Sequence, residues 1–457
     1  MLTAWDRPAL ADAARPLSRL AFASLVVLSP FRARIELAAR PTPPVYGDYT
    51  DFVVLWSEVA LLAVLALWLI SLARGRRVPT MGPRFLAVPV GGLLAVAALG
   101  IPVAVDPALA AWNVLHLALF VALALYVVNE LDLADLAVPI GIMVVIQAVV
   151  AIGQAVAQRS LGLDGLGEHT LSPILGVSVV TAADGARLLR AYGLADHPNI
   201  LGGILVFALL LLPIARRAGD RLGFPANVFA VGAVTLFVTF SRAAALGLVV
   251  GLAVLAGILV ARGDRPGARR WIGALILAGV ACAPFVLADA PFVGARTDAS
   301  GSIATEARSI TERAALAAEA SLLFIDHPLL GVGLGDLPLA MHAADPSFPY
   351  PYQPAHLVLL DVAAETGVLG GLLYLAILVS PWLAMVRSRE RWTTDLAAAS
   401  AALAAVTVVG FFDYYTWTFP AGRIWGWLVL GMWAVAYRRA RVAVGLKPLA
   451  HQVAISA

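Results

Sequence analysis

The chain has 457 residues, of which 61% are hydrophobic and only 13% are charged, and its mean hydropathy is +0.87. One soluble core cannot bury so much apolar surface, so the composition excludes an ordinary soluble domain and indicates a protein embedded in lipid. The net charge of +3, with no cluster of basic and aromatic residues, excludes nucleic acid as an expected partner, and the single cysteine excludes a disulfide framework.

The apolar residues fall into blocks separated by short charged loops. A block of about 18 to 25 residues crosses roughly 30 Å of hydrocarbon as a helix. Strand-like alternation is absent, so a barrel is not expected. The sequence therefore predicts an all-α polytopic membrane protein of about twelve transmembrane helices, at residues 18–31, 52–72, 85–105, 108–128, 136–157, 198–215, 225–240, 243–260, 271–287, 354–386, 396–412 and 423–436.

Basic residues gather at alternate loop ends, which is the positive-inside pattern of membrane proteins. Placing both termini in the cytoplasm puts most of the 32 Lys and Arg residues on that face. One loop there, residues 129–135, is acidic, but acidic residues weigh little in this rule. Beyond the N-terminus, the basic residues on this face are Arg74, Arg76, Arg77, Arg216, Arg217, Arg221, Arg262, Arg265, Arg269, Arg270, Arg387, Arg389, Arg391, Arg438, Arg439, Arg441 and Lys447.

Three segments on the outer face are longer than tight turns: residues 32–51, 158–197 and 288–353. Only the last is long enough to fold into a lid. The chain is thus expected to divide into spans one to nine (1–287), a lid loop (288–353), and spans ten to twelve with a cytoplasmic tail (354–457). Within the lid, residues 304–325 predict a surface helix, and 326–352, rich in Gly and Pro, are expected to be irregular. The apolar face of that helix is expected to carry Ala307, Ile310, Ala314 and Ala317.

Two arginines on the outer face have no acidic partner at a pairing distance on their own element. Arg242 stands in Thr-Phe-Ser-Arg-Ala between two apolar blocks. A guanidinium group there requires an anion or a cluster of carbonyls, unless the side chain reaches the lipid headgroups. Only apolar residues and one serine stand three and four positions from Arg313, so no helical ion pair explains it. Both arginines are therefore predicted to bind an anionic ligand.

Further candidates surround the start of the sixth span. Arg190 precedes it in Arg-Ala-Tyr-Gly-Leu-Ala-Asp-His-Pro-Asn, so Arg190 either binds the same anion or pairs with Asp196. Asp196 and Pro198 are expected as the cap and first-turn residue of this helix, whose N-terminus would face outward and attract anions. Asp196 and His197 are supporting candidates.

The tenth span begins with a histidine and carries two carboxylates. His356 follows Pro354 in the expected first turn, opposite several arginines, and these favour the neutral imidazole that a general base needs; a lone histidine is, however, more often structural. Asp361 and Glu365 share one helical face, where a partner on another helix is expected rather than catalysis. Glu365 is kept as a supporting candidate. No metal-ligand spacing is found, so neither metal nor cofactor is expected.

From Arg190 to Gly371 the chain resembles the O-antigen ligase and O-antigen polymerase superfamily of bacterial envelope glycosyltransferases. The resemblance rests on the order of several motifs and on the long loop between the ninth and tenth spans. The motifs are Arg190-Ala-Tyr-Gly with His197-Pro-Asn, Ser241-Arg242, Arg313 before His327-Pro-Leu-Leu-Gly-Val-Gly-Leu-Gly, and His356 followed by Leu360, Glu365, Gly367 and Gly370.

The resemblance implies a GT-C-like architecture in the bacterial inner membrane, with a metal-independent active site on the periplasmic face. Its donor would be a glycan on undecaprenyl diphosphate, and its acceptor a sugar of lipid A-core type or another glycan. Arg242 and Arg313 would hold the diphosphate, Arg190 less directly, and His356 would take the acceptor proton. Guanidinium groups placed in advance would stabilise the negative charge that develops on the leaving diphosphate.

Two departures from the family pattern leave ligase and polymerase open. Leu357 stands where a polar residue often follows the histidine, and Ala317 where an aromatic residue is common in the lid helix. Both positions bear on the acceptor pocket. A transporter or flippase of lipid-linked sugars is the alternative from another class, although such a protein should line a path across the whole membrane with polar groups.

Overall fold

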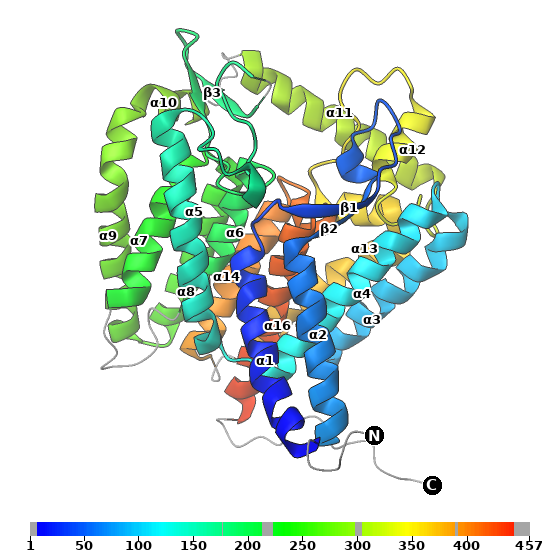
Figure 1. Ribbon diagram of the computed structural model, residues 1–457, viewed down its shortest axis with the longest axis vertical. Coiled ribbons are helices and arrows are strands. Elements are labelled where there is room, and N and C mark those ends of the chain that lie inside the picture. The colour runs from blue at the N-terminus through cyan, green and yellow to red at the C-terminus, as the bar shows by residue number, and fades with distance from the viewer. Residues whose placement is uncertain (1–6, 176, 213–222, 298–303, 389–391, 443–457) are drawn as a thin grey trace.

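The computed structural model describes residues 7–175, 177–212, 223–297, 304–388 and 392–442. It is a bundle of long helices with short strands and helices gathered at one end (Figure 1). Each predicted span corresponds to one helix of the bundle. These are α1 (Arg7–Leu28), α2 (Trp56–Gly75), α3 (Arg84–Gly100), α4 (Pro107–Glu130), α5 (Ala137–Ala157), α6 (Pro198–Leu210), α7 (Gly223–Val238), α8 (Arg242–Ala261), α9 (Arg265–Ala288), α13 (Val358–Val386), α14 (Thr394–Gly410) and α16 (Pro420–Val442).

Seven helices in the described ranges are long and apolar enough to cross a membrane: α2, α3, α4, α5, α8, α9 and α13. Three shorter apolar helices, α6, α7 and α14, belong to the same bundle. The helices α1 and α16 also carry several arginines. The chain is therefore a multi-pass helical membrane protein, and the number of twelve spans stays a prediction.

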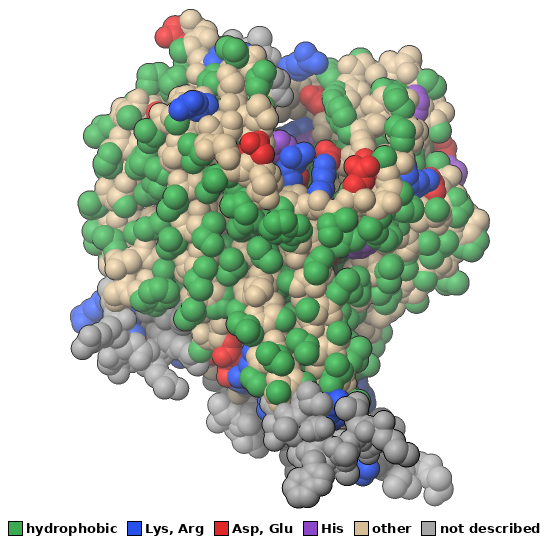
Figure 2. All heavy atoms as spheres, in the orientation of Figure 1, with side chains coloured by type: hydrophobic (Ala, Val, Ile, Leu, Met, Phe, Trp, Pro, Cys, Tyr) green, Lys and Arg blue, Asp and Glu red, His purple; other side chains and the backbone are tan. Residues whose placement is uncertain are grey.

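Apolar packing places α6 at the centre of the bundle. Leu205 and Phe207 on this helix are fully buried, as are Trp425 and Trp433 on α16, which packs against it. The helix α6 is buried on every side because its sequence is apolar all round. Exposed apolar side chains cover the middle of the molecule, with charged ones above and below (Figure 2). This band is where lipid would contact the protein.

One end of the bundle, called the site end below, carries the short elements (Figure 1). Two antiparallel pairs of strands lie at this end. One pairs β1 (Arg34–Ala38) with β2 (Phe52–Leu55), and the other pairs β3 (Val179–Thr181) with β4 (Arg187–Leu189). The helices α10 (Ala290–Thr297), α11 (Ala304–Asp326), α12 (Leu337–Ala344) and α15 (Tyr415–Thr418) accompany them, with single turns at Gly47–Tyr49, Ile101–Val103, Leu133–Leu136 and Asp164–Leu166 elsewhere along the chain. The all-α expectation missed the strands, and residues 326–352 are not irregular throughout, because α12 lies among them.

The helix α11 was predicted in the right place, but of the predicted apolar face only Ala317 packs against the core among the described side chains. Its buried residues are Leu316, Ala320 and Leu323, which pack with α12 and the segment before α13. Ile310 is 59% exposed and Ala314 is exposed. The side chain of Ala307 lies outside the described residues. Hydropathy alone could not locate this face, because α11 packs on protein rather than on lipid.

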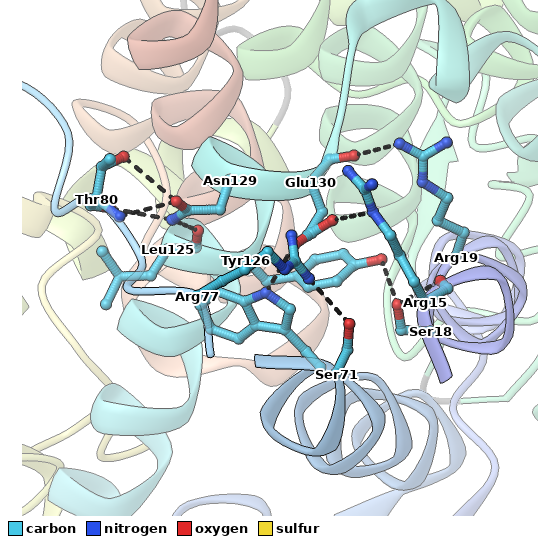
Figure 3. A network of polar contacts seen from close by, with 11 residues as sticks. Arg15, Ser18, Arg19, Ser71, Arg77, Thr80, Leu125, Tyr126, Asn129 and Glu130 are labelled. Carbon is cyan, nitrogen blue, oxygen red and sulfur yellow. Dashed lines mark hydrogen bonds and ion pairs between the residues drawn. The ribbon is translucent and has the colours of Figure 1, made fainter. Parts of the chain in front are cut away.

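The opposite end of the bundle is held together by Glu130, at the end of α4 (Figure 3). Its carboxylate accepts hydrogen bonds from Arg15 Nε at 2.8 Å and Arg77 Nη1 at 2.9 Å, and its carbonyl oxygen accepts one from Arg19. Asp132 in the same loop contacts Arg439. The acidic loop 129–135 therefore neutralises arginines at its own end of the bundle rather than opposing their distribution. The predicted basic residues Arg216, Arg217, Arg221, Arg389, Arg391 and Lys447 lie outside the described residues.

The helix α13 is broken at Gly367, where φ is 76° and ψ is −177°. The freed backbone is paired with the glycine-rich segment before α12: Val368 N donates to Pro328 O, Val332 N to Ala364 O and Gly333 N to Glu365 O. Irregular backbone at membrane depth is tolerated only when protein satisfies it in this way. The repeated glycines of 331–335 permit the approach, because a Cβ at Gly331 would lie 2.3 Å from the carbonyl carbon of Glu365.

Substituting Gly367 with alanine should therefore unfold this region. A Cβ would lie 2.1 Å from Leu329 O, and the backbone conformation is one that costs other residues about 1–3 kcal/mol even without a clash. We expect Gly367→Ala to lose its monodisperse peak in size-exclusion chromatography and to melt several degrees lower. Gly279→Ala, on α9 where a Cβ meets nothing within 4 Å, should leave both measurements unchanged; equal behaviour of the two variants would contradict the packing described.

Candidate active site

A cavity of about 920 Å³, called the large cavity below, lies at the site end. Basic, acidic and histidine side chains gather around a hollow there (Figure 2). The lining comes from segments far apart in sequence, including the loops before α6 and α13, the starts of α8 and α15, and α10 and α11. Its polar lining residues are Tyr46, Ser178, Arg190, Tyr192, His197, Asn199, Arg242, Arg296, Ser309, Glu312, Arg313, Gln353, His356, Asp413 and Tyr414.

Most of the candidates identified in the sequence meet at this cavity. Arg190, Arg242, Arg313, His197 and His356 all line it. Asp196 does not; it lines an adjacent smaller cavity. Glu365 lines neither and is buried at the break in α13. The convergence of the arginines and the imidazole is thus observed, whereas their chemical roles stay predictions.

Arg190 is fixed by polar contacts and is only 6% exposed. Its Nε donates to Thr239 O at 2.8 Å, and its Nη2 donates to Asn199 Oδ1. Asn199 Nδ2 in turn donates to Asp413 Oδ2 at 2.7 Å. The expected alternative, a pair between Arg190 and Asp196, is wrong, because Asp196 pairs with Arg32 at 3.1 Å. Arg190 is held in place from behind by Asn199, which anchors it to Asp413.

Arg242 is the first residue of α8 and is exposed at the cavity. Ser241 caps this helix, its Oγ accepting from Ala244 N, so the Thr-Phe-Ser-Arg sequence forms a tight turn with the free amides of α8 at the site end. Arg296 on α10 comes to the same place and donates to Phe240 O at 3.2 Å. The turn between α7 and α8 therefore brings two guanidinium groups to one wall.

Arg313 lies on α11, and its neighbour Glu312 is hydrogen-bonded to the rest of the site. Gln353 Nε2 donates to Glu312 Oε1 at 2.7 Å, and Tyr414 Oη donates to Gln353 Oε1 at 3.0 Å. These bonds link α11 to the segments that carry His356 and Tyr414. The position of Arg313 is thus set relative to the imidazole and not only by the helix.

His356 lies in the loop before α13, not in its first turn as expected, because the helix begins at Val358. Its φ is 57°, a left-handed conformation uncommon for histidine. Asp361 Oδ1 accepts from Ala355 N at 2.8 Å and so fixes this loop. The imidazole packs edge-on against Tyr414 with ring centroids 4.6 Å apart. Burial, and then the positive charge of Arg313, lower the pKa of His356 to about 3, so the imidazole is neutral at neutral pH.

The start of α6 differs from the expectation in one residue. His197, not Asp196, is the N-cap, and its Nδ1 accepts from Asn199 N at 3.1 Å. Its Nε2 lies 2.7 Å from Ser178 Oγ. Asp196 instead forms an ion pair with Arg32. Burial nevertheless raises the pKa of Asp196 to about 6. Burial, followed by the charge of Arg190, lowers the pKa of His197 well below its usual value.

Of the two carboxylates of α13, Glu365 has the expected partner on another helix, whereas Asp361 bonds to the loop that precedes its own helix. Glu365 Oε2 accepts from Trp417 Nε1 at 2.8 Å, which joins the break in α13 to α15. Asp361 fixes the loop of His356 through Ala355. Within the described ranges, no three His, Cys, Asp or Glu side chains lie together as a metal site would require.

Among the lining residues that the sequence reasoning did not identify are Asn199, Arg296, Asp413 and Tyr414. Asn199 stands in the His-Pro-Asn motif that was noted, and Asp413-Tyr414 occupy a loop that the topology places on the outer face. The signal that could have identified Asp413 and Tyr414 is an acidic residue beside aromatic residues in a short outer loop. Arg296 had none, because its neighbours in sequence resemble an ordinary loop.

The charges of the large cavity favour an anion. Four arginines, Arg190, Arg242, Arg296 and Arg313, face it with two acidic residues, Glu312 and Asp413. Burial raises the pKa of Asp413, opposed chiefly by Arg313, and its oxygens accept from Asn199 and from the amide of Tyr414. Leu246, Ile310 and Phe412 add exposed apolar surface to the lining. The lining therefore combines guanidinium groups, which bind phosphate-like anions well, with apolar surface.

Residues 227–375, about a third of the chain, match the family model described as O-antigen ligase. The matched region runs from α7 to α13 and contains Arg242, Arg296, Arg313 and His356, but not Arg190. The match confirms the resemblance to the O-antigen ligase and polymerase superfamily. A comparison of the chain with curated proteins gave no match.

Proposed function

Because residues 227–375 match the O-antigen ligase family model, we propose that the protein is a glycosyltransferase. It would move a glycan from undecaprenyl diphosphate to a hydroxyl group of an acceptor sugar. The observation that carries the proposal is the meeting of four arginines and the neutral imidazole of His356 around a single cavity with apolar surface in its lining. Each of these groups matches one part of such a donor or one step of its transfer.

The donor diphosphate would lie between Arg242 and Arg313, with Arg296 beside them and Arg190 behind. The acceptor oxygen attacks the anomeric carbon while the bond from that carbon to the diphosphate oxygen breaks, and the electron pair leaves with the diphosphate. The guanidinium groups stabilise this growing charge without having to reorganise. The proton of the acceptor hydroxyl passes to His356, and attack from the opposite face inverts the anomeric centre.

Binding of the donor would also prepare the base. Arg313 lowers the pKa of His356 in the ligand-free cavity. A bound diphosphate brings negative charge that offsets Arg313, and a nearby anion favours the protonated imidazole. The pKa of His356 therefore rises when the donor binds, and the imidazole becomes a better proton acceptor only in the loaded site.

The proposed location is the bacterial inner membrane, with the site end facing the periplasm. The support for this orientation is the gathering of arginines at the opposite end, where Arg15, Arg19 and Arg77 surround Glu130. Undecaprenyl-linked glycans that are joined to envelope acceptors would meet the protein on the outer side.

Ligation to a lipid A-core type acceptor is the first choice for the reaction, and polymerisation, with a second lipid-linked glycan as acceptor, is the alternative. The test uses purified protein in nanodiscs with an undecaprenyl-diphosphate glycan and either lipid A-core or no other acceptor. A ligase gives glycosylated lipid A-core, whereas a polymerase gives longer lipid-linked glycan from donor alone; mass spectrometry separates them. Absence of both products with intact, bound donor would overturn the proposal.

A further inference from the structure

A second cavity of about 180 Å³, called the small cavity below, adjoins the large one. Four residues line both: His197, Asn199, Asp413 and Tyr414. Tyr414 also packs edge-on against His356. The small cavity is therefore separated from the proposed base by little more than this shared wall. Its volume suits one sugar ring or several waters.

The two cavities differ in charge. In contrast to the cationic large cavity, the small one is lined by one arginine, Arg32, and three aspartates, Asp48, Asp196 and Asp413. Arg32 pairs with Asp196 at 3.1 Å, Asp48 pairs at 3.0 Å with Arg34 outside the lining, and Asp413 accepts from Asn199. A diphosphate would find no excess of positive charge there. A neutral ligand with many hydroxyl groups fits such paired groups, because charged side chains form strong hydrogen bonds with hydroxyls.

Aromatic rings form another part of the lining. The centroids of Tyr49, Tyr414 and Phe419 lie 6.1 to 6.4 Å from one another. Tyr414 Oη donates to Gln353, so Tyr49 Oη donates to Tyr414 Oη across 2.8 Å. The oxygen of Tyr49 is thereby left free to accept. Aromatic faces beside hydroxyl acceptors match a sugar ring, which has apolar C–H faces and a polar edge.

His169 contributes an imidazole to the lining of the small cavity. Its Nε2 is buried and has no hydrogen-bond partner among the described residues. The ring is held by an edge-on contact with Tyr192 at 5.2 Å. Burial, and then Arg32, lower the pKa of His169 to about 4, so the imidazole is neutral at neutral pH. A buried polar nitrogen left without a partner is costly unless a ligand or water satisfies it.

We propose that the small cavity is the acceptor subsite, where a neutral sugar ring lies among Tyr49, Phe419 and His169 and presents its reactive hydroxyl at Tyr414 toward His356. The proposal rests on the proposed glycosyl transfer and adds to it a place for the acceptor. Donor and acceptor then occupy separate chambers that meet at the reacting atoms, one cationic for the diphosphate and one without an excess of positive charge for the sugar.

The test is steady-state kinetics of His169→Phe, which keeps a ring but removes the nitrogen. The assay uses undecaprenyl-diphosphate glycan as donor and lipid A-core as acceptor, or the second donor molecule if the wild type polymerises. Loss of one neutral hydrogen bond should raise the acceptor KM about three- to tenfold, with kcat and donor KM within twofold of wild type. His169→Gln, whose amide can replace Nε2, should recover at least half of the loss.

His342→Phe is the matched control, because His342 also has a buried ring nitrogen without a partner among the described residues, packs on a tyrosine, Tyr352, and lines neither cavity. It should leave the acceptor KM unchanged. Should His169→Phe fail to fold, Phe419→Leu, which removes an aromatic face, must raise the same constant.

An unchanged acceptor KM in the folded variants, or a rise in donor KM instead, would overturn the subsite. Failure of the wild type itself to form product would overturn the proposed function.

Discussion

Replacing His356 with alanine is expected to lower kcat for glycan transfer by about 10²- to 10⁴-fold, the usual contribution of a general base. Donor affinity should stay within a few-fold, because the arginines that face the diphosphate are untouched. The measurement is single-turnover transfer together with binding of undecaprenyl diphosphate to the same preparation. Transfer at the wild-type rate would remove the imidazole as the base.

The left-handed backbone conformation of His356 determines which second variant is suitable. Its φ of 57° is tolerated better by asparagine than by alanine. His356→Asn should therefore fold as well as wild type and still fail to transfer, which separates the loss of a base from the loss of structure. The control His342→Ala, on α12 and away from the cavity, should keep full activity.

The pH profile follows from the same residue. The pKa of His356 lies at about 3 in the free protein, against an ordinary value of 6.5, and a bound diphosphate moves it upward from 3. The rate of glycan transfer should therefore fall as the pH decreases, since protonation removes the base. The midpoint of this acid limb should lie between about pH 3 and the ordinary histidine pKa of 6.5. A limb above pH 7 would contradict a base that lies beside Arg313.

Substituting Arg313 with alanine is expected to weaken donor binding about 10- to 100-fold, because a charge-assisted contact with a phosphate contributes about 1.5–3 kcal/mol. Arg313→Lys should recover part of this, since it keeps the charge but not the two-pronged geometry. Binding of undecaprenyl diphosphate, titrated in nanodiscs, is the measurement. Arg308→Ala is the control, because Arg308 is exposed on the same helix and is not among the residues lining the cavity.

Arg313→Ala should also change the base. Its charge lowers the pKa of His356, so its removal raises that pKa and shifts the acid limb to higher pH. A residue that only held α11 in place would weaken binding without moving the limb. An unshifted limb with weakened binding would therefore exclude Arg313 as a neighbour of the imidazole that acts through charge.

Features read from single residues or local patterns could be predicted from the sequence. The spans follow from hydropathy, so each predicted one has its helix. Arg242, Arg313 and His356 stood out because charged or polar groups at the edge of apolar blocks need a reason to be there. The glycines of 331–335 were noted as a motif. Their role, which is to let the backbone at Gly331 and Gly333 approach the broken turn of α13, is visible only in the structure.

What could not be predicted depends on contacts between distant segments. Asp196 fails as a helix cap because Arg32, far away in sequence, binds it. Asn199 holds Arg190 only because Asp413, 214 positions later, accepts its amide. The apolar face of α11 was partly misplaced, with only Ala317 correct, because its packing partners lie on α12 and α13, which no periodicity within α11 reveals. The strands were missed because pairs of three to five residues leave no readable alternation.

The central claim is that the site end catalyses transfer rather than passage of the donor across the bilayer. It is tested by placing the protein in proteoliposomes with undecaprenyl-diphosphate glycan in one leaflet and an acceptor, and following two readouts together: the mass of the acceptor and the leaflet in which the donor lies. The account predicts that acceptor gains the glycan, that undecaprenyl diphosphate is released, and that His356→Asn abolishes both. Movement of intact donor between leaflets, with no change in acceptor mass, would contradict it.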